Sequence, residues 1–146
     1  MKRAQRLQPV HELARETERS CAARVAGMER RLADSEARLQ ELRRYHGEYQ
    51  QAWQSRASAG LEVRSVREYQ TFMAKLAGAL EAQLGIVERL RADCDQERQQ
   101  LRQALAHRLA LGKVIEKAHS EERAMEDRKV QRELDERAQY GRTVPR

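Results

Sequence analysis

Mostly apolar residues recur at alternating steps of three and four along most of the chain, and at steps of seven at its start. In the first half these positions are Leu7, Ala14, Cys21, Val25, Met28, Leu32, Ser35, Leu39, Leu42, His46, Tyr49 and Trp53. In the second half they are Val66, Tyr69, Met73, Leu76, Leu80, Gln83, Val87, Leu90, Cys94, Glu97, Leu101, Ala104, Arg108, Leu111 and Ile115. Such spacing is typical of the a and d positions of a coiled coil. The sequence therefore predicts two long amphipathic helices.

Composition supports long helices and argues against a globular enzyme. Pro9 and Pro145 are the two prolines, and only 4% of the residues are aromatic. Aromatic side chains normally dominate a thick core, so a deep catalytic pocket is not expected. Ser35, Gln83, Glu97 and Arg108 are polar members of the two series. Polar residues at such positions lower stability but can fix the register of the helices.

A turn separates the two series. Gly60 is a natural helix stop, because glycine adopts the left-handed conformation readily. Ser65 and Glu68 have the spacing of a capping box that opens the second helix. Pro9 suits the first turn of the first helix, and Gly141 is expected to end the second.

These signals divide the chain into five segments. We expect a flexible N-terminus (1–8), helix 1 (9–57), a turn (58–65), helix 2 paired with helix 1 (66–115), and an overhanging helix with a C-terminal tail (116–146). A short turn between helices gives an antiparallel hairpin. The predicted fold is all-α: a long two-helix antiparallel coiled-coil hairpin with an unpaired C-terminal helical extension.

Pairing around the turn specifies the core layers. Trp53 should pair with Tyr69, Tyr49 with Met73, and Leu7 with Ile115 at the last layer. The segment beyond Ile115 is rich in Glu, Arg and Lys and keeps few apolar residues. An unpaired helix is marginal in water, so this segment is either frayed in isolation or awaits a partner.

Five of the six aromatic residues lie between residues 45 and 72. Tyr49, Trp53 and Tyr69 fit the core. Tyr45 and Phe72 occupy g positions, which usually carry charged residues. Either they widen the core or they form an exposed apolar strip beside Leu42 and Leu76; exposed apolar surface rimmed by charge is typical of protein contacts.

Nothing in the sequence supports catalysis, a cofactor or a bound metal. The four histidines are far apart, and Cys21 and Cys94 fit neither metal spacing nor a disulfide framework. The net charge of +6 is spread thinly, so we expect no specific nucleic-acid binding. No signal peptide and no transmembrane segment are recognised, which predicts a cytoplasmic chain with reduced thiols.

Short motifs resemble a known family. They are Tyr45-His46-Gly47-Glu48-Tyr49, Ser58-Ala59-Gly60, Tyr69-Gln70-Thr71-Phe72 and Leu134-Asp135-Glu136-Arg137-Ala138-Gln139. Nearly end to end, the chain is similar to the flagellar FliJ family, small coiled-coil components of the bacterial flagellar type III protein export apparatus. The central motifs are fairly specific, whereas the flanking heptads would match many coiled coils.

The resemblance implies a hairpin similar to the stalk, or γ, subunit of rotary ATPases. It implies a non-catalytic protein that inserts into the export ATPase hexamer, contacts the export gate's membrane protein and binds export chaperones. The implied location is the cytoplasmic face of the cell membrane at the flagellar base, with roles in flagellum biogenesis and cell motility.

The same resemblance implies where the partners bind. The export-gate contact maps onto Leu42, Tyr45, Tyr49, Phe72, Leu76 and Ala79. At two further positions this chain has Arg38 and Gln83, where the family pattern can show Gln and His, so the polar rim of the strip differs. The ATPase ring contact falls at the far end of the hairpin, with Arg128, Lys129, Arg132 and Arg137 as candidates.

Three other functions stay open on the sequence. The chain could be the equivalent stalk protein of a virulence type III secretion system. It could also be a generic self-associating coiled-coil scaffold or a basic-helix nucleic-acid binder. The hairpin predicts a monomer, because pairing within one chain uses the apolar seams and explains the turn at Gly60.

Overall fold

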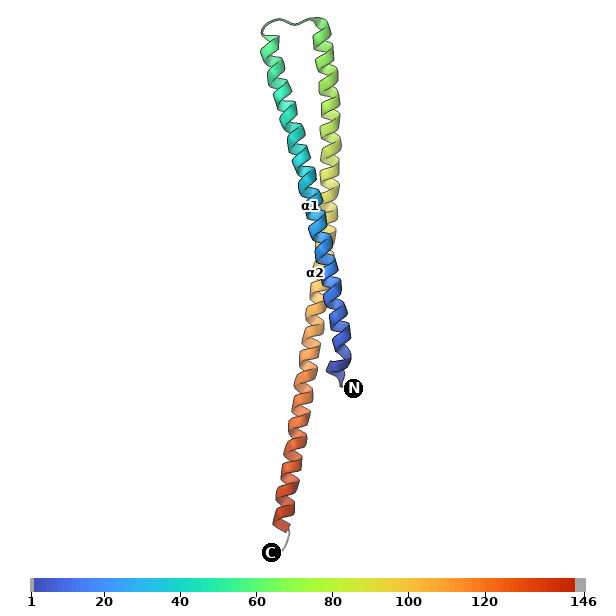
Figure 1. Ribbon diagram of the computed structural model, residues 1–146, viewed down its shortest axis with the longest axis vertical. Helices are drawn as coiled ribbons and strands as arrows, with labels where there is room; N and C mark the ends of the chain where they lie inside the picture. Colours follow the sequence, from blue (N-terminus) through green and yellow to red (C-terminus); the bar gives the residue numbers. More distant parts are fainter. Residues whose placement is uncertain (1, 144–146) are drawn as a thin grey trace. The chain divides into compact units, whose positions relative to one another are not determined.

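The computed structural model describes residues 2–143, which form two helices. Helix α1 spans Arg3–Ala57 and helix α2 spans Val63–Thr143. They are joined by a short turn and pack against each other in opposite directions (Figure 1). The predicted all-α hairpin is confirmed. Neither helix contains, within the described residues, a stretch apolar enough to cross a membrane.

The turn ends α1 as the glycine signal predicts. Gly60 has a φ of 91°, in the left-handed region that glycine tolerates without a Cβ clash. The amide of Ala59 donates to the carbonyl of Arg56 at 3.0 Å, and that of Gly60 to Ala57 at 3.3 Å. These tightened bonds satisfy carbonyls at the end of α1, and the chain then reverses.

Helix α2 begins earlier than the sequence predicts, at Val63 rather than residue 66. The amide of Val66 already donates to the carbonyl of Glu62 at 3.2 Å, so Ser65 lies inside the first turn. Glu68 pairs with Arg64 instead of reaching back to Ser65. The predicted capping box is therefore wrong, because the helix starts upstream of it.

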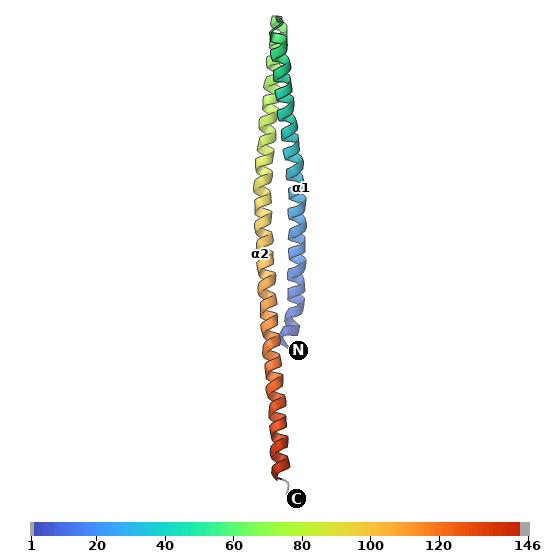
Figure 2. The same ribbon diagram turned by 90° about the vertical axis from the view of Figure 1, so that its left-hand side faces the viewer.

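Contacts between residues group into two units. The turn unit is Cys21–Leu101, and the described part of the terminal unit is residues 2–20 and 102–143. In the turn unit α1 and α2 run next to each other along the hairpin, and they cross in projection near the middle of Figure 1 and near the turn in Figure 2. Its buried side chains all belong to the predicted seams: Cys21, Val25, Ser35, Leu39, Val87 and Cys94. The thiols of Cys21 and Cys94 are free.

Polar seam residues of the turn unit bond across the interface. The Gln83 side-chain amide donates to the carbonyl of Ser35 at 3.0 Å and to its hydroxyl at 3.1 Å. Glu97 accepts from Arg24 at 3.2 Å. Because a shift in register would leave these partly buried groups without partners, the polar layers favour one alignment.

In the terminal unit α1 starts at Arg3, so the predicted flexible segment 1–8 is wrong from that residue on, and Pro9 lies inside the helix. Ala4 packs with Ile115 and Ala118, and Leu7 packs against them. The Ala4 amide also donates to Glu122 Oε1 at 3.2 Å, which caps the start of α1. These contacts offset the hydrogen bond that Pro9 cannot make.

Pairing in the terminal unit extends past residue 115, where the sequence placed its end. Ala118 is buried, and Glu122 is half-buried through its bond to Ala4. Arg108, a seam residue, forms an ion pair with Glu18 of α1. From residue 123 to 142 every residue is exposed, although α2 continues through Gly141 to Thr143. The last three residues of the predicted tail, 144–146, lie outside the described residues.

Candidate functional site

The strongest candidate site is the apolar strip of the turn unit. We use this name for the six residues that the family pattern marks: Leu42, Tyr45, Tyr49, Phe72, Leu76 and Ala79. In α1 they are spaced by three and four residues, and in α2 by four and three. Each set therefore lies on one face of its helix.

The rings of the strip are open to solvent. Tyr45, Tyr49 and Phe72 are 41%, 47% and 41% exposed, whereas Leu42 and Leu76 are half-buried. The Tyr49 and Phe72 rings meet across the two helices with centroids 4.5 Å apart. Tyr45 and Phe72 thus face outward as their g positions predict. The assignment of Tyr49 to the core is wrong, because its ring turns onto Phe72.

Charged neighbours modify this surface without covering it. The guanidinium carbon of Arg44 lies 5.6 Å from the centroid of the Tyr45 ring, a cation–π distance. Arg44 also pairs with Glu48 at 3.7 Å on the same helix. Ile86, 45% exposed, extends the apolar surface along α2. The strip is an apolar area with a polar border, which suits binding to a protein.

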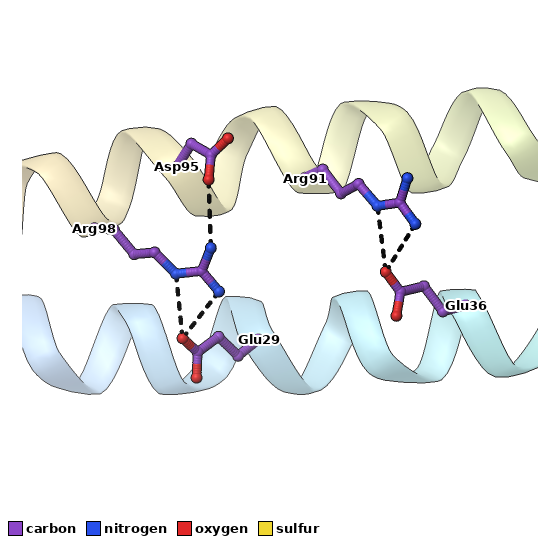
Figure 3. A network of polar contacts seen from close by, with 5 residues as sticks. All are labelled: Glu29, Glu36, Arg91, Asp95 and Arg98. Carbon is purple, nitrogen blue, oxygen red and sulfur yellow. Dashed lines mark hydrogen bonds and ion pairs between the residues drawn. The ribbon is translucent and has the colours of Figure 1, made fainter.

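The opposite edge of the turn unit has a different chemistry. There, at e positions, Arg91 pairs with Glu36 and Arg98 pairs with Glu29, each at 3.2 Å (Figure 3). Asp95 accepts a further bond from Arg98 at 3.3 Å. The hydrogen bond to Glu29 raises the pKa of the Arg98 guanidinium above its ordinary value. This edge therefore uses its charges to join the two helices.

The basic residues proposed for the ATPase ring lie in the terminal unit and are all exposed: Arg128, Lys129, Arg132 and Arg137. Two of them share a pocket. Lys129 and Arg132 border one pocket of about 470 Å³, together with Met125. Arg137 borders another pocket, and Arg128 borders none of those described.

Two residues that border the pocket of Lys129 and Arg132 were not selected as candidates from the sequence. Lys2 and Arg3 lie at the start of the chain, yet they border the same pocket as Lys129 and Arg132. The capping bond from Ala4 to Glu122 holds the start of α1 against α2. Because residues 1–8 were assigned to a flexible segment, the contact between the start of α1 and α2 was not predicted. A continuation of the heptad spacing upstream of Leu7, to Ala4, is the signal that could have revealed it.

A second missed group lies beside the strip. Trp53 and Tyr69 stack with centroids 4.1 Å apart and ring planes 3° apart, which confirms their predicted layer. They also border a pocket with Arg56 and Glu68, which sequence reasoning did not select. Arg56 is the next position of the heptad spacing after Trp53, and this charged residue at a seam position is the signal that could have selected it.

The arrangement is suited to binding. The described residues contain no group of three or more His, Cys, Asp or Glu side chains that could hold a metal ion. The turn unit has an exposed apolar area, and the terminal unit has exposed side chains of both charges.

Comparison with known proteins identifies one family. The family model described as "Flagellar FliJ protein" matches residues 1–142. No curated protein and no solved structure matches the chain.

Proposed function

The chain belongs to the FliJ family of flagellar proteins, and on that premise we propose how it works as a component of the flagellar export apparatus. We propose that it is a non-catalytic coupling protein. In this role it binds the export gate through the apolar strip and the export ATPase ring through the terminal unit. It also binds export chaperones, and it is located at the cytoplasmic face of the membrane at the flagellar base.

The exposure of the strip is the observation that carries the gate contact. Tyr45, Tyr49 and Phe72 each leave more than a third of their surface in water. Exposing so much aromatic surface costs free energy, at roughly 25 cal/mol per Å² of apolar area, unless a partner covers it. Aromatic residues are also enriched among those that dominate binding energy at interfaces.

The exposed end of α2 supports a separate contact with the ATPase ring. Residues 123–142 are exposed throughout, and a helix of this length without a partner is marginal in water. Lys129 and Arg132 add positive charge beside the apolar side chain of Met125, in a pocket that Glu121, Glu122 and Glu126 also border. A socket in the ATPase ring with acidic groups opposite these two bases would complement them.

The family match favours the flagellar machine over a virulence secretion system. Pairing of the two seams within one chain favours a monomer over a self-associating scaffold, since the buried residues of the turn unit are covered by the chain itself.

A pull-down with two purified partners tests the proposed function. The full chain should retain both the export ATPase and the cytosolic domain of the export-gate membrane protein. A chain that retains neither, while remaining helical by circular dichroism, would refute the proposal.

A further inference from the structure

A pocket lined by four aromatic rings lies beside the apolar strip, next to the turn. Tyr49 and Trp53 of α1 and Tyr69 and Phe72 of α2 border it. Its volume of about 300 Å³ is at the lower end of the range for ligand pockets, roughly 300–1,000 Å³. It therefore has room for one large side chain. Since Tyr49 and Phe72 belong to the strip, the pocket and the strip form one continuous surface.

The rings hold each other in place. Trp53 and Tyr69 are stacked with their planes 3° apart, and Tyr49 and Phe72 contact each other at an angle of 42°. Both contacts join α1 to α2, so each ring is fixed from the opposite helix. A pocket that is already formed needs less ordering when a partner binds, which favours affinity.

Charge at the pocket is unbalanced. Arg56 and Glu68 both border it, and the carboxylate of Glu68 lies 3.4 Å from the guanidinium of Arg64. The Arg56 guanidinium makes no hydrogen bond or ion pair with any of residues 2–143. The negative charge of Glu68 is therefore balanced by Arg64, whereas the positive charge of Arg56 has no partner among residues 2–143. This favours an anionic group beside the pocket and disfavours a cation within it.

We propose that the pocket receives one large apolar side chain of the protein that binds the strip, and that a carboxylate next to that side chain pairs with Arg56. This inference rests on the proposed function, because the partner is the export-gate domain. Two observations favour this occupant. The pocket continues the proposed contact surface, and the unpaired charge beside it, on Arg56, is positive. Aromatic and arginine side chains are also the types most enriched at binding hot spots.

The single tryptophan of the chain gives a direct probe, because Trp53 borders the pocket. The full chain is labelled with 5-fluorotryptophan and titrated with the unlabelled cytosolic domain of the export-gate protein. Binding is followed in parallel by calorimetry. The fluorine resonance should change its chemical shift and saturate at the stoichiometry that calorimetry gives. A control chain carries Trp53→Phe and Ala33→Trp, which moves the probe to an exposed position outside the pocket; its shift should stay constant.

The two measurements separate failure of the pocket from failure of the proposed function. Binding by calorimetry with an unchanged Trp53 shift means that the domain binds and leaves the pocket empty, which overturns the inference alone. Absence of binding by calorimetry overturns the inference together with the proposed gate contact.

Two pairs of variants test whether binding depends on the charge of Arg56 and on the empty volume of the pocket. Arg56→Glu should weaken binding at least about tenfold, since a charge-assisted hydrogen bond is lost. Arg67→Glu makes the same charge change at an exposed position outside the pocket and should stay within about twofold. Ala52→Phe fills the pocket from its lining, whereas Ala33→Phe does not. If Arg56→Glu and Ala52→Phe bind as well as their controls, with circular dichroism unchanged, the inference is wrong.

Discussion

The side-chain amide of Gln83 donates to both the backbone carbonyl and the hydroxyl of Ser35, at 3.0 and 3.1 Å. Ser35 is buried and Gln83 is half-buried. The pair thus forms a polar layer within an otherwise apolar seam of the turn unit. Such a layer disfavours alternative alignments, because a shifted Gln83 would face apolar side chains.

Removing this layer should lower stability by a measurable amount. Gln83→Ala loses both bonds and leaves the Ser35 hydroxyl without its partner, so we expect a loss of about 1–2 kcal/mol in unfolding free energy. Gln40→Ala, at an exposed position of α1, serves as control and should change little. Urea unfolding followed by circular dichroism measures both, and equal losses would show that the Ser35–Gln83 layer is not stabilising.

The ion pairs at the opposite edge should contribute less, because they are exposed. Glu29→Gln combined with Glu36→Gln removes the carboxylates that pair with Arg98 and Arg91. Exposed pairs of this kind are expected to contribute little to stability, and 1 M salt should reduce the difference between the variant and the natural chain. Glu41→Gln is the control, since Glu41 forms no ion pair within residues 2–143. A loss that persists unchanged at high salt would contradict this account.

The start of α1 should depend on Glu122. Glu122→Ala removes the acceptor of the Ala4 amide, and loss of a cap typically costs about 0.5–2 kcal/mol. We expect faster hydrogen exchange at the amides of residues 4–7, with the turn unit unaffected. Glu121→Ala removes a neighbouring carboxylate that does not cap α1. Identical exchange in the two variants would show that the cap is not important.

The exposed end of α2 should matter for the ATPase and not for folding. A chain ending at Glu122 keeps Ile115 and Ala118 packed against Ala4, so its thermal unfolding should match that of the full chain. We expect it to lose stimulation of the export ATPase, measured as the rate of ATP hydrolysis. Full stimulation by the shortened chain would rule out a role for residues 123–146.

A charge-reversal pair refines that prediction. Lys129→Glu with Arg132→Glu changes the two bases that share a pocket, whereas Arg128→Glu with Arg137→Glu makes the same charge change outside it. The first pair should reduce stimulation more strongly, because it reverses the charge beside Met125. A stronger effect of the second pair would move the ring contact to another face of α2.

Sequence periodicity predicted the hairpin because burial in a coiled coil repeats with the helix. Every buried residue from Ala14 to Ile115 is a member of the predicted seams. The turn could be predicted because Gly60 tolerates the positive φ that it adopts there. Both are local or periodic properties, which one sequence displays directly.

The errors arose where distant contacts override local signals. Pro9 looked like a helix start, yet α1 begins at Arg3 because Glu122, far away in the sequence, caps it. Ser65 and Glu68 have capping-box spacing, but the helix had already begun at Val63. For the site, periodicity placed Tyr45 and Phe72 outside the core. The rotation of the Tyr49 ring onto Phe72, and the pocket that follows from it, depend on packing that spacing does not encode.

The affinity of the export-gate cytosolic domain for a strip variant measures whether the apolar strip is the gate-binding surface. In Tyr45→Ala, Tyr49→Ala, Phe72→Ala the three exposed rings are removed together. The matched control is Leu13→Ala, Leu105→Ala, Leu109→Ala, which removes three exposed apolar side chains outside the strip.

We predict that calorimetry shows a loss of at least about 100-fold in affinity for the strip variant and less than about threefold for the control, with both chains helical by circular dichroism. Equal affinities of the two variants would contradict the assignment of the apolar strip as the gate-binding surface.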